Sequence, residues 1–174
     1  MEERKEESSL EIEGYEDSKV YMESSTEIEC PLEVVWSVLL DFDNYKEWSS
    51  FTPEVKLNKE AKIGSEFTMN VKMDPKNESL REQKLTFQGI DEEKHTICWT
   101  AQVSFLLSSK RLQKIQKIGN EKTLYQTKEA FSGILKYVID SFFITTLKER
   151  FSDTANDLKK YCEKKYKEMR DSSK

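Results

Sequence analysis

The sequence predicts an α+β fold in which a curved antiparallel sheet of six to seven strands wraps around a long C-terminal helix, with two short helices after the first strand. Three observations predict it. Apolar and polar residues alternate in short runs between residues 20 and 132, short polar segments connect the runs, and residues 135–169 carry apolar side chains at three- and four-residue spacing. Short connections favour antiparallel pairing, and so long an amphipathic helix needs a broad apolar surface to lie on.

The first strand and the two short helices are predicted from residues 20–48. The strand's alternating residues are Val20, Met22, Ser24, Thr26 and Ile28. Pro31 is typical of the first turn of a helix, and apolar residues then repeat at helical spacing through Leu39. A second short helix is expected at about Phe42–Trp48, where Asp41 or Asp43 can cap its first turn.

The remaining strands follow Pro53. Alternating runs predict them at Val55–Leu57, Phe67–Met73, Leu85–Gly89, Ile97–Val103, 108–118 and 122–132. Between them, Asp74–Ser79 predicts a turn or loop, Asp91–Lys94 a hairpin connection and Gly119–Asn120 a turn. These short connections are the reason for expecting one continuous antiparallel sheet.

The net charge of −5 belongs to the N-terminal segment. Residues 1–17 contain eight acidic and two basic residues, a net charge of −6, which leaves +1 for residues 18–174. We therefore expect an acidic, disordered tail at residues 1–17 and one folded domain at 18–170. Leu10, Ile12 and Tyr15 are the apolar exceptions in the tail, and docking as an extra edge strand is the alternative for them.

Composition excludes several classes of function. A nearly neutral domain gives no reason to expect nucleic-acid binding, which depends on clustered positive charge. No run of 18 apolar residues predicts an integral membrane segment, and the charged N-terminus predicts no secretory signal. Three widely spaced cysteines, Cys30, Cys98 and Cys162, suit a reduced, cytoplasmic protein.

Common catalytic and cofactor motifs are missing from the sequence. The five glycines stand singly, so they form neither a dinucleotide fingerprint nor a phosphate-binding loop. His95 is the one histidine and has no metal-ligand spacing to a cysteine. We therefore expect no cofactor, no metal site and no covalent catalytic residue.

Two segments resemble a known family. Thr26–Leu39 followed by Asp41–Trp48 resembles the opening of the START-like polyketide cyclase/dehydrase superfamily (SRPBCC, birch-pollen-allergen-like): a strand, a proline-containing turn, a Val-Trp helix, then Asp-Phe, Tyr and Trp. The spacing of the family's final strand is also present in this sequence, at Thr123, Glu129, Phe131 and Gly133. The resemblance covers roughly residues 18–165, and its motifs are specific for fold and weak for function.

The resemblance implies a helix-grip fold with a cavity between the sheet and the C-terminal helix. Members bind lipids, sterols or polyketides, so we expect this chain to bind a small hydrophobic molecule, which it could also transport. We also expect a monomer, for which transient contact with a membrane is possible. One alternative is a cyclase/dehydrase enzyme that uses Glu129, Tyr125 and Arg111 as acid–base groups. Another is a protein-binding module like the activator of a chaperone ATPase.

The candidate ligand-binding residues are those expected to face the cavity: Phe67, Met69, Trp99, Arg111, Gln113, Tyr125, Thr127, Glu129, Phe131, Val138 and Phe142. For the aromatic residues among them, ordinary core packing is the alternative. The family usually has a His at the position of Arg111 and an apolar residue at that of Gln113.

Arg111 and Gln113 share an inward face if the strand register holds. Arg111 would then form an interior ion pair with Glu129 and, with Tyr125, give the cavity a polar end that orients a ligand's carboxylate or hydroxyl. The alternative is a one-residue slip of the strand, which would put Arg111 and Gln113 in solvent.

Overall fold

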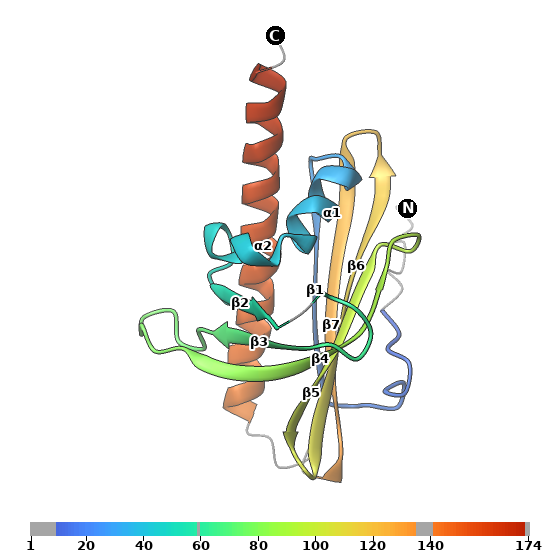
Figure 1. Ribbon diagram of the computed structural model, residues 1–174, viewed down its shortest axis with the longest axis vertical. Coiled ribbons are helices and arrows are strands. Elements are labelled where there is room, and N and C mark those ends of the chain that lie inside the picture. Colours follow the sequence, from blue (N-terminus) through green and yellow to red (C-terminus); the bar gives the residue numbers. More distant parts are fainter. Residues whose placement is uncertain (1–9, 59, 135–140, 173–174) are drawn as a thin grey trace, which may run out of the picture.

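The structure, a computed structural model, describes residues 10–58, 60–134 and 141–172. The elements in chain order are β1 (Tyr21–Ile28), α1 (Leu32–Leu40), the 3₁₀ helix η1 (Phe42–Glu47), β2 (Glu54–Leu57), β3 (Glu66–Val71), β4 (Arg81–Asp91), β5 (Thr96–Ser104), β6 (Leu107–Gly119), β7 (Lys122–Ser132) and α2 (Ser141–Ser172). They form one antiparallel sheet against one long helix (Figure 1).

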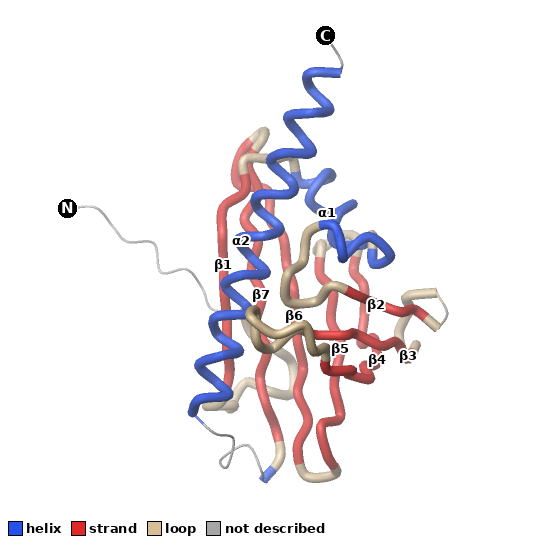
Figure 2. Tube along the Cα trace, turned by 90° about the vertical axis from the view of Figure 1, so that its left-hand side faces the viewer, coloured by secondary structure: helices blue, strands red, loops and turns tan. Residues whose placement is uncertain are grey.

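The sheet has seven strands in the order β1-β7-β6-β5-β4-β3-β2. The first strand therefore pairs with the last, and β2 forms the opposite edge. The pairing of β4 with β5 shifts register between Phe87 and Gly89, and that of β5 with β6 shifts between Gln102 and Ser104. Bulges of this kind bend a sheet. Helix α2 lies on one side of it, in contact with β1 and β7 (Figure 2), which confirms the predicted helix-grip fold.

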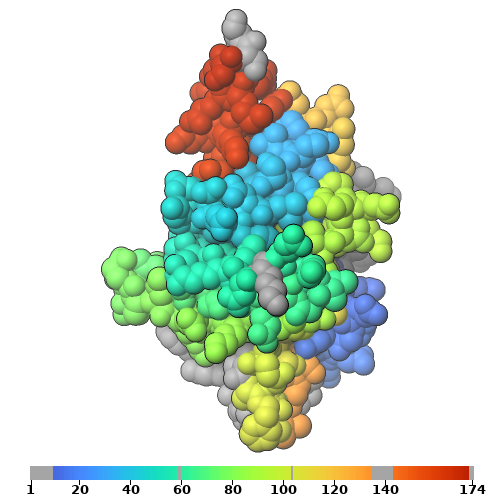
Figure 3. Space-filling view, viewed as in Figure 1, coloured from blue at the N-terminus to red at the C-terminus, as the bar shows by residue number. Residues whose placement is uncertain are grey.

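The two short helices lie over one part of the sheet beside α2. Helix α1 contacts α2, β6 and β7, and the indole Nε1 of Trp36 donates a hydrogen bond of 2.6 Å to Glu92 in the β4–β5 turn. In Figure 3, α1 and η1 cover the upper part of the front, and the C-terminal part of α2 projects beyond them. The short helices therefore cover one part of the concave face.

Aromatic rings fill the core beneath these helices. Phe67 stacks on Phe87 with ring centroids 4.0 Å apart, and Trp99 meets Phe67 edge-on at 5.9 Å. Phe42 of η1 also meets Phe87 edge-on, with ring centroids 5.6 Å apart. Offset and edge-on contacts between buried rings are favourable beyond the area they bury. Core packing, the alternative given above for the aromatic residues, therefore accounts for Phe67.

The polar site depends on the register between β6 and β7. Arg111 pairs with Glu129 and Gln113 with Thr127 across the ladder. Along β6 the buried residues are Ser109, Arg111, Gln113 and Ile115. Because side chains alternate between the two faces of a strand, this pattern places Arg111 and Gln113 inside, and the one-residue slip is excluded.

Some element boundaries differ from the prediction. Pro31 takes the cap position before α1, and neither Asp41 nor Asp43 caps η1 through its side chain. Met73 lies beyond the end of β3. Helix α2 continues to Ser172, and residues 135–140 of the predicted helix lie outside the described residues.

The described part of the acidic segment, residues 10–17, packs on the outer face of the sheet. Ile12 is only 3% exposed, and the hydroxyl of Tyr15 lies 3.1 Å from that of Ser108. The ammonium of Lys110 donates to the carbonyl of Glu13 at 2.9 Å. These residues form turns rather than the edge strand considered above. Residues 10–17 therefore contact the sheet, while residues 1–9 lie outside the described residues, and the domain boundary at residue 18 stays a prediction.

Candidate ligand-binding site

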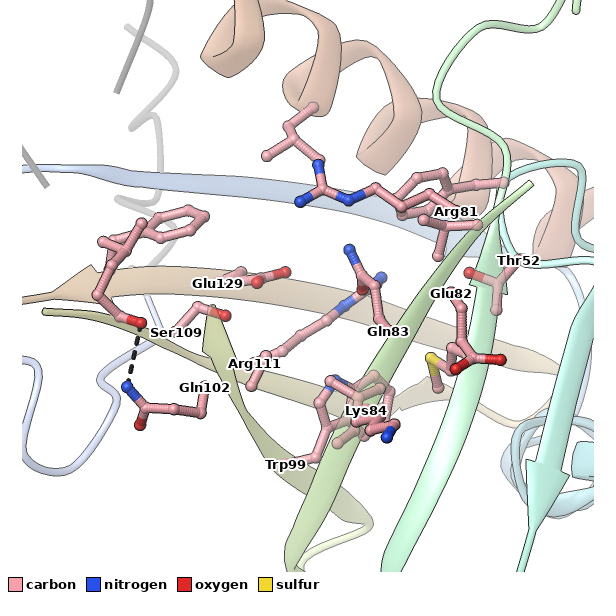
Figure 4. Close-up of a pocket in the computed structure, with 18 of the residues that line it drawn as sticks. Thr52, Arg81, Glu82, Gln83, Lys84, Trp99, Gln102, Ser109, Arg111 and Glu129 are labelled. Atoms are coloured by element: carbon pink, nitrogen blue, oxygen red, sulfur yellow. Dashed lines mark hydrogen bonds between the residues drawn. The ribbon is translucent and has the colours of Figure 1, made fainter. Parts of the chain in front are cut away.

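A pocket of about 340 Å³ lies between the concave face of the sheet and the first turns of α2 (Figure 4). We call it the inner pocket. Its lining residues are Phe51, Thr52, Met69, Val71, Arg81, Glu82, Gln83, Lys84, Leu85, Trp99, Ala101, Gln102, Leu107, Ser109, Arg111, Glu129, Phe131, Phe143 and Leu147. The volume lies at the lower end of the range for small-molecule sites.

Most of the deep wall is apolar. The side chains of β3, β4 and β5 that point inward supply Met69, Val71, Leu85 and Trp99, and Leu147 of α2 closes the opposite side. These residues are buried because the alternation of each strand turns them toward α2. This wall can remove an apolar surface from water.

Arg111 brings a positive charge into the polar end of the pocket. Its side chain is 6% exposed, and its Nε donates a hydrogen bond of 3.2 Å to the hydroxyl of Thr127. The guanidinium carbon lies 4.1 Å from the ring centre of Phe151 and 5.6 Å from that of Trp99. The negative faces of aromatic rings attract a cation, so both rings help to hold the guanidinium.

Glu129 faces Arg111 across the β6–β7 ladder and lines the same pocket. Burial raises the pKa of its carboxyl, and the charge of Arg111 and the hydroxyl of Ser109 oppose that rise. The predicted ion pair is not formed, because within the described residues no carboxylate oxygen lies within 4.0 Å of a guanidinium nitrogen of Arg111. In Figure 4, Arg111, Glu129 and Gln83 extend into one space beneath α2.

A layer of polar side chains supports Arg111 from behind. The hydroxyl of Tyr125 donates to the amide oxygen of Gln113 at 2.6 Å, and that of Tyr45 donates to the carbonyl of Leu39 at 2.8 Å. Burial raises the pKa of both tyrosines, and the charge of Arg111 opposes the rise. Because these groups are satisfied by one another and by the backbone, they hold the polar strand face in one arrangement.

The predicted site residues fall into three groups. Five of them line the inner pocket: Met69, Trp99, Arg111, Glu129 and Phe131. Another group is buried without lining it: Phe67, Gln113, Tyr125 and Thr127. Val138 and the side chain of Phe142 lie outside the described residues. Contact of any of these residues with a ligand stays a prediction.

Sequence reasoning missed other lining residues. Val71, Leu85, Ala101 and Ser109 lie on the inward faces of predicted strands, so the same alternation could have found them. Thr52 and Arg81 come from the segment after η1 and the start of β4. No local pattern marks these two, because their position depends on how the loops cross the mouth.

A more open groove continues from the inner pocket. It has a volume of about 800 Å³, lies between the β3–β4 loop and α2, and shares Arg81 and Phe143 with the pocket. Arg150 lines it, and one of its terminal nitrogens pairs with Asp153 at 2.5 Å. Arg81 and Phe143 therefore stand between the pocket and this outer groove.

The cysteines offer no reactive thiol. Cys30 and Cys162 are fully buried, and Cys98 is partly buried. Burial raises the pKa of the Cys30 thiol to about 11 and raises the pKa of the other two thiols as well. A thiol of this kind carries little of the thiolate form that reacts.

No helix in the described part of the chain combines the length and the apolar character that crossing a membrane requires. Within the same residues, no three or more His, Cys, Asp or Glu side chains are grouped so as to hold a metal ion.

Comparison with known proteins gave a family and a fold. The model of a family described as "Polyketide cyclase / dehydrase and lipid transport" matches residues 19–163. No sequence among curated proteins matched the chain.

Solved structures resemble the fold. The Zhui aromatase/cyclase from Streptomyces sp. R1128 has a TM-score of 0.66 and 13% identity, with 82% of this chain and 93% of that chain covered. A START superfamily protein from Mycobacterium smegmatis has a TM-score of 0.61 and 15% identity, with 86% and 98% covered. Ara h 8.0201 has a TM-score of 0.63 and 11% identity, with 82% and 96% covered. At these identities the likeness concerns the fold alone.

Proposed function

Because the chain belongs to the polyketide cyclase/dehydrase and lipid transport family, we propose that it binds a small, largely apolar molecule in the inner pocket, without covalent catalysis. The observation that carries the proposal is a pocket of about 340 Å³ whose deep wall is apolar and whose one end is polar. The proposal includes a monomeric, cytoplasmic protein that contacts membranes transiently when it collects or delivers its ligand.

The buried apolar area sets the scale of the affinity that the wall can supply. A ligand that buries about 300 Å² of apolar surface gains roughly 7.5 kcal/mol at 25 cal/mol per Å². Association costs of at least about 4 kcal/mol are subtracted from that gain. The remainder corresponds to a Kd in the millimolar range for that area, so a ligand binds more tightly when it buries more apolar surface or also contacts the polar end.

The test uses N-phenyl-1-naphthylamine, a neutral dye whose fluorescence rises in apolar surroundings. We expect saturable binding by the wild-type protein and a loss of at least about tenfold in Ala101→Phe, since a ring at this lining position fills the pocket. Thr100→Phe is the matched control, because Thr100 is the neighbouring residue on β5 and its hydroxyl bonds Gln88 on an exposed surface. Equal binding by wild type and Ala101→Phe, or none by wild type, would contradict the proposal.

Native mass spectrometry of freshly purified protein provides a second test. A co-purified ligand of lipid or polyketide size would support the proposal and identify the ligand. Repeated failure to find or load any apolar molecule would favour the protein-binding module instead.

A cyclase/dehydrase activity is the second candidate, and Glu129 is the observation that favours it. A carboxyl group whose pKa is raised by burial beside a cationic side chain suits a general acid. Turnover of a polyketone analogue that is lost in Glu129→Gln, with dye binding unchanged, would support this activity. Absence of turnover in a protein that binds the dye would leave binding as the function.

A further inference from the structure

We propose that the molecule bound in the inner pocket carries one anionic group, a carboxylate or a similar oxyanion, and that this group binds the guanidinium of Arg111. The inference rests on the proposed function and names the class of ligand: an amphiphilic acid with an apolar body.

Arg111 keeps its positive charge inside the pocket. A guanidinium stays protonated even when buried, and removing it from water is costly unless an opposite charge compensates it. Its contacts include a neutral hydroxyl, on Thr127, and two uncharged rings. These contacts stabilise the cation without neutralising it.

Two other arginines in the described residues have the carboxylate partner that Arg111 lacks, while Arg81 is exposed to water. Arg150 pairs with Asp153 at 2.5 Å, and Arg170 pairs with Glu121 at 3.5 Å. Unlike Arg150 and Arg170, Arg111 lines the inner pocket, yet no carboxylate of the described residues lies within 4.0 Å of it. The pocket therefore holds a buried cation whose compensating anion the described residues do not supply.

Glu129 is the side chain that could have supplied the anion. It lies opposite Arg111 in the ladder, but its carboxylate oxygens lie more than 4.0 Å from the guanidinium nitrogens, and burial raises the pKa of its carboxyl. Glu129 therefore leaves the terminal nitrogens of Arg111 open to a ligand oxygen.

Donor geometry also suits an oxyanion. The Nε of Arg111 is already bonded to Thr127, which leaves the two terminal amino groups for a ligand. These two groups form a planar fork that matches the two oxygens of a carboxylate. The amide of Gln83 lines the same pocket and offers a further donor.

The experiment compares two displacing ligands of equal chain length, dodecanoate and dodecan-1-ol, against bound N-phenyl-1-naphthylamine. On the wild-type protein we expect dodecanoate to bind at least about tenfold more tightly than the alcohol, since hydrogen bonds to charged groups are the stronger ones. In Arg111→Gln, dodecanoate should weaken by about tenfold to a hundredfold, and the alcohol and the dye by less than about threefold.

Arg170→Gln is the matched control. It removes the same charge from an exposed arginine near the C-terminal end of α2, which lines neither the inner pocket nor the outer groove. We expect it to change dodecanoate binding by less than about threefold, because water screens an exposed charge outside the pocket. Dye binding by each variant reports that it is folded, and Arg111→Lys, which keeps the charge without the fork, should show an intermediate loss.

The outcomes separate the two proposals. If the wild-type protein does not bind the dye, the proposed function fails and the inference fails with it. If the dye binds but dodecanoate and dodecan-1-ol displace it equally, the inference is overturned and the proposed function stands. This comparison needs no variant, so it holds even where Arg111→Gln fails to fold. An equal effect of Arg170→Gln and Arg111→Gln would also overturn the assignment to Arg111.

Discussion

Two halves of the same concave face differ in the side chains that they bury, aromatic in one and polar in the other. Beneath the short helices, Phe42, Phe67 and Phe87 pack ring against ring, and all three are buried. Farther along, β6 and β7 turn a row of polar side chains inward, with Arg111 at the pocket. Close packing gains stability, whereas a buried guanidinium without a carboxylate lowers it. The difference indicates that the aromatic half maintains the fold and the polar half binds the ligand.

The largest expected effect comes from opening the aromatic half. Phe87→Ala removes a fully buried ring that contacts Phe67, Trp99 and Phe42. We expect the free energy of unfolding to fall by about 3–5 kcal/mol, because the deletion leaves a cavity that the packed core cannot close. Denaturant unfolding measures it.

Selectivity for dodecanoate should survive in whatever Phe87→Ala protein remains folded. If Phe87→Ala instead abolished the preference for acid over alcohol while stability stayed near the wild-type value, the two halves would not be separable in the way described.

A smaller effect is expected from the outer face behind the polar half. Ile12→Ala should lower the free energy of unfolding by about 2 kcal/mol, since Ile12 is 3% exposed and its segment is held to β6 by Tyr15 and Lys110. Deleting residues 1–9 should have little effect, and Glu11→Ala, at an exposed neighbour, is the matched control. Thermal unfolding of the three variants checks this; an unchanged Tm in Ile12→Ala would show that the segment does not dock in solution.

The smallest effect concerns the pH dependence of stability. Because the pKa of Glu129 is raised in the folded protein, its neutral form favours folding, and this contribution is complete below the unfolded pKa and is lost as pH rises through the folded pKa. Glu129→Gln keeps a side chain of similar shape that does not titrate. We therefore expect a flatter stability profile above about pH 4.5 in Glu129→Gln than in wild type, measured by urea unfolding across pH. Parallel profiles would show that Glu129 ionises in the folded state as it does in the unfolded chain.

Local patterns were sufficient for most of the fold and part of the site. Alternation predicted the inward face of β6, and the observed pairing of Arg111 with Glu129 decided between that register and the slip. The family resemblance predicted from Thr26–Trp48 is confirmed by the family match over residues 19–163.

Other features depend on tertiary structure. The prediction of an ion pair between Arg111 and Glu129 was wrong. Neighbouring positions in a ladder do not fix where long side chains end, and Phe151 and Thr127 hold the guanidinium elsewhere. Ile12 stands among acidic residues, so no periodicity indicated that it would be buried. Arg81 lines the pocket only because the start of β4 crosses its mouth.

A crystal structure of the protein with dodecanoate bound tests the central claim most directly. The account predicts the carboxylate within hydrogen-bond distance, about 3 Å, of the terminal nitrogens of Arg111, with the alkyl chain along Met69, Leu85 and Leu147. A chain bound the other way, with its carboxylate at the mouth beside Arg81 and its methyl end against Arg111, would contradict it.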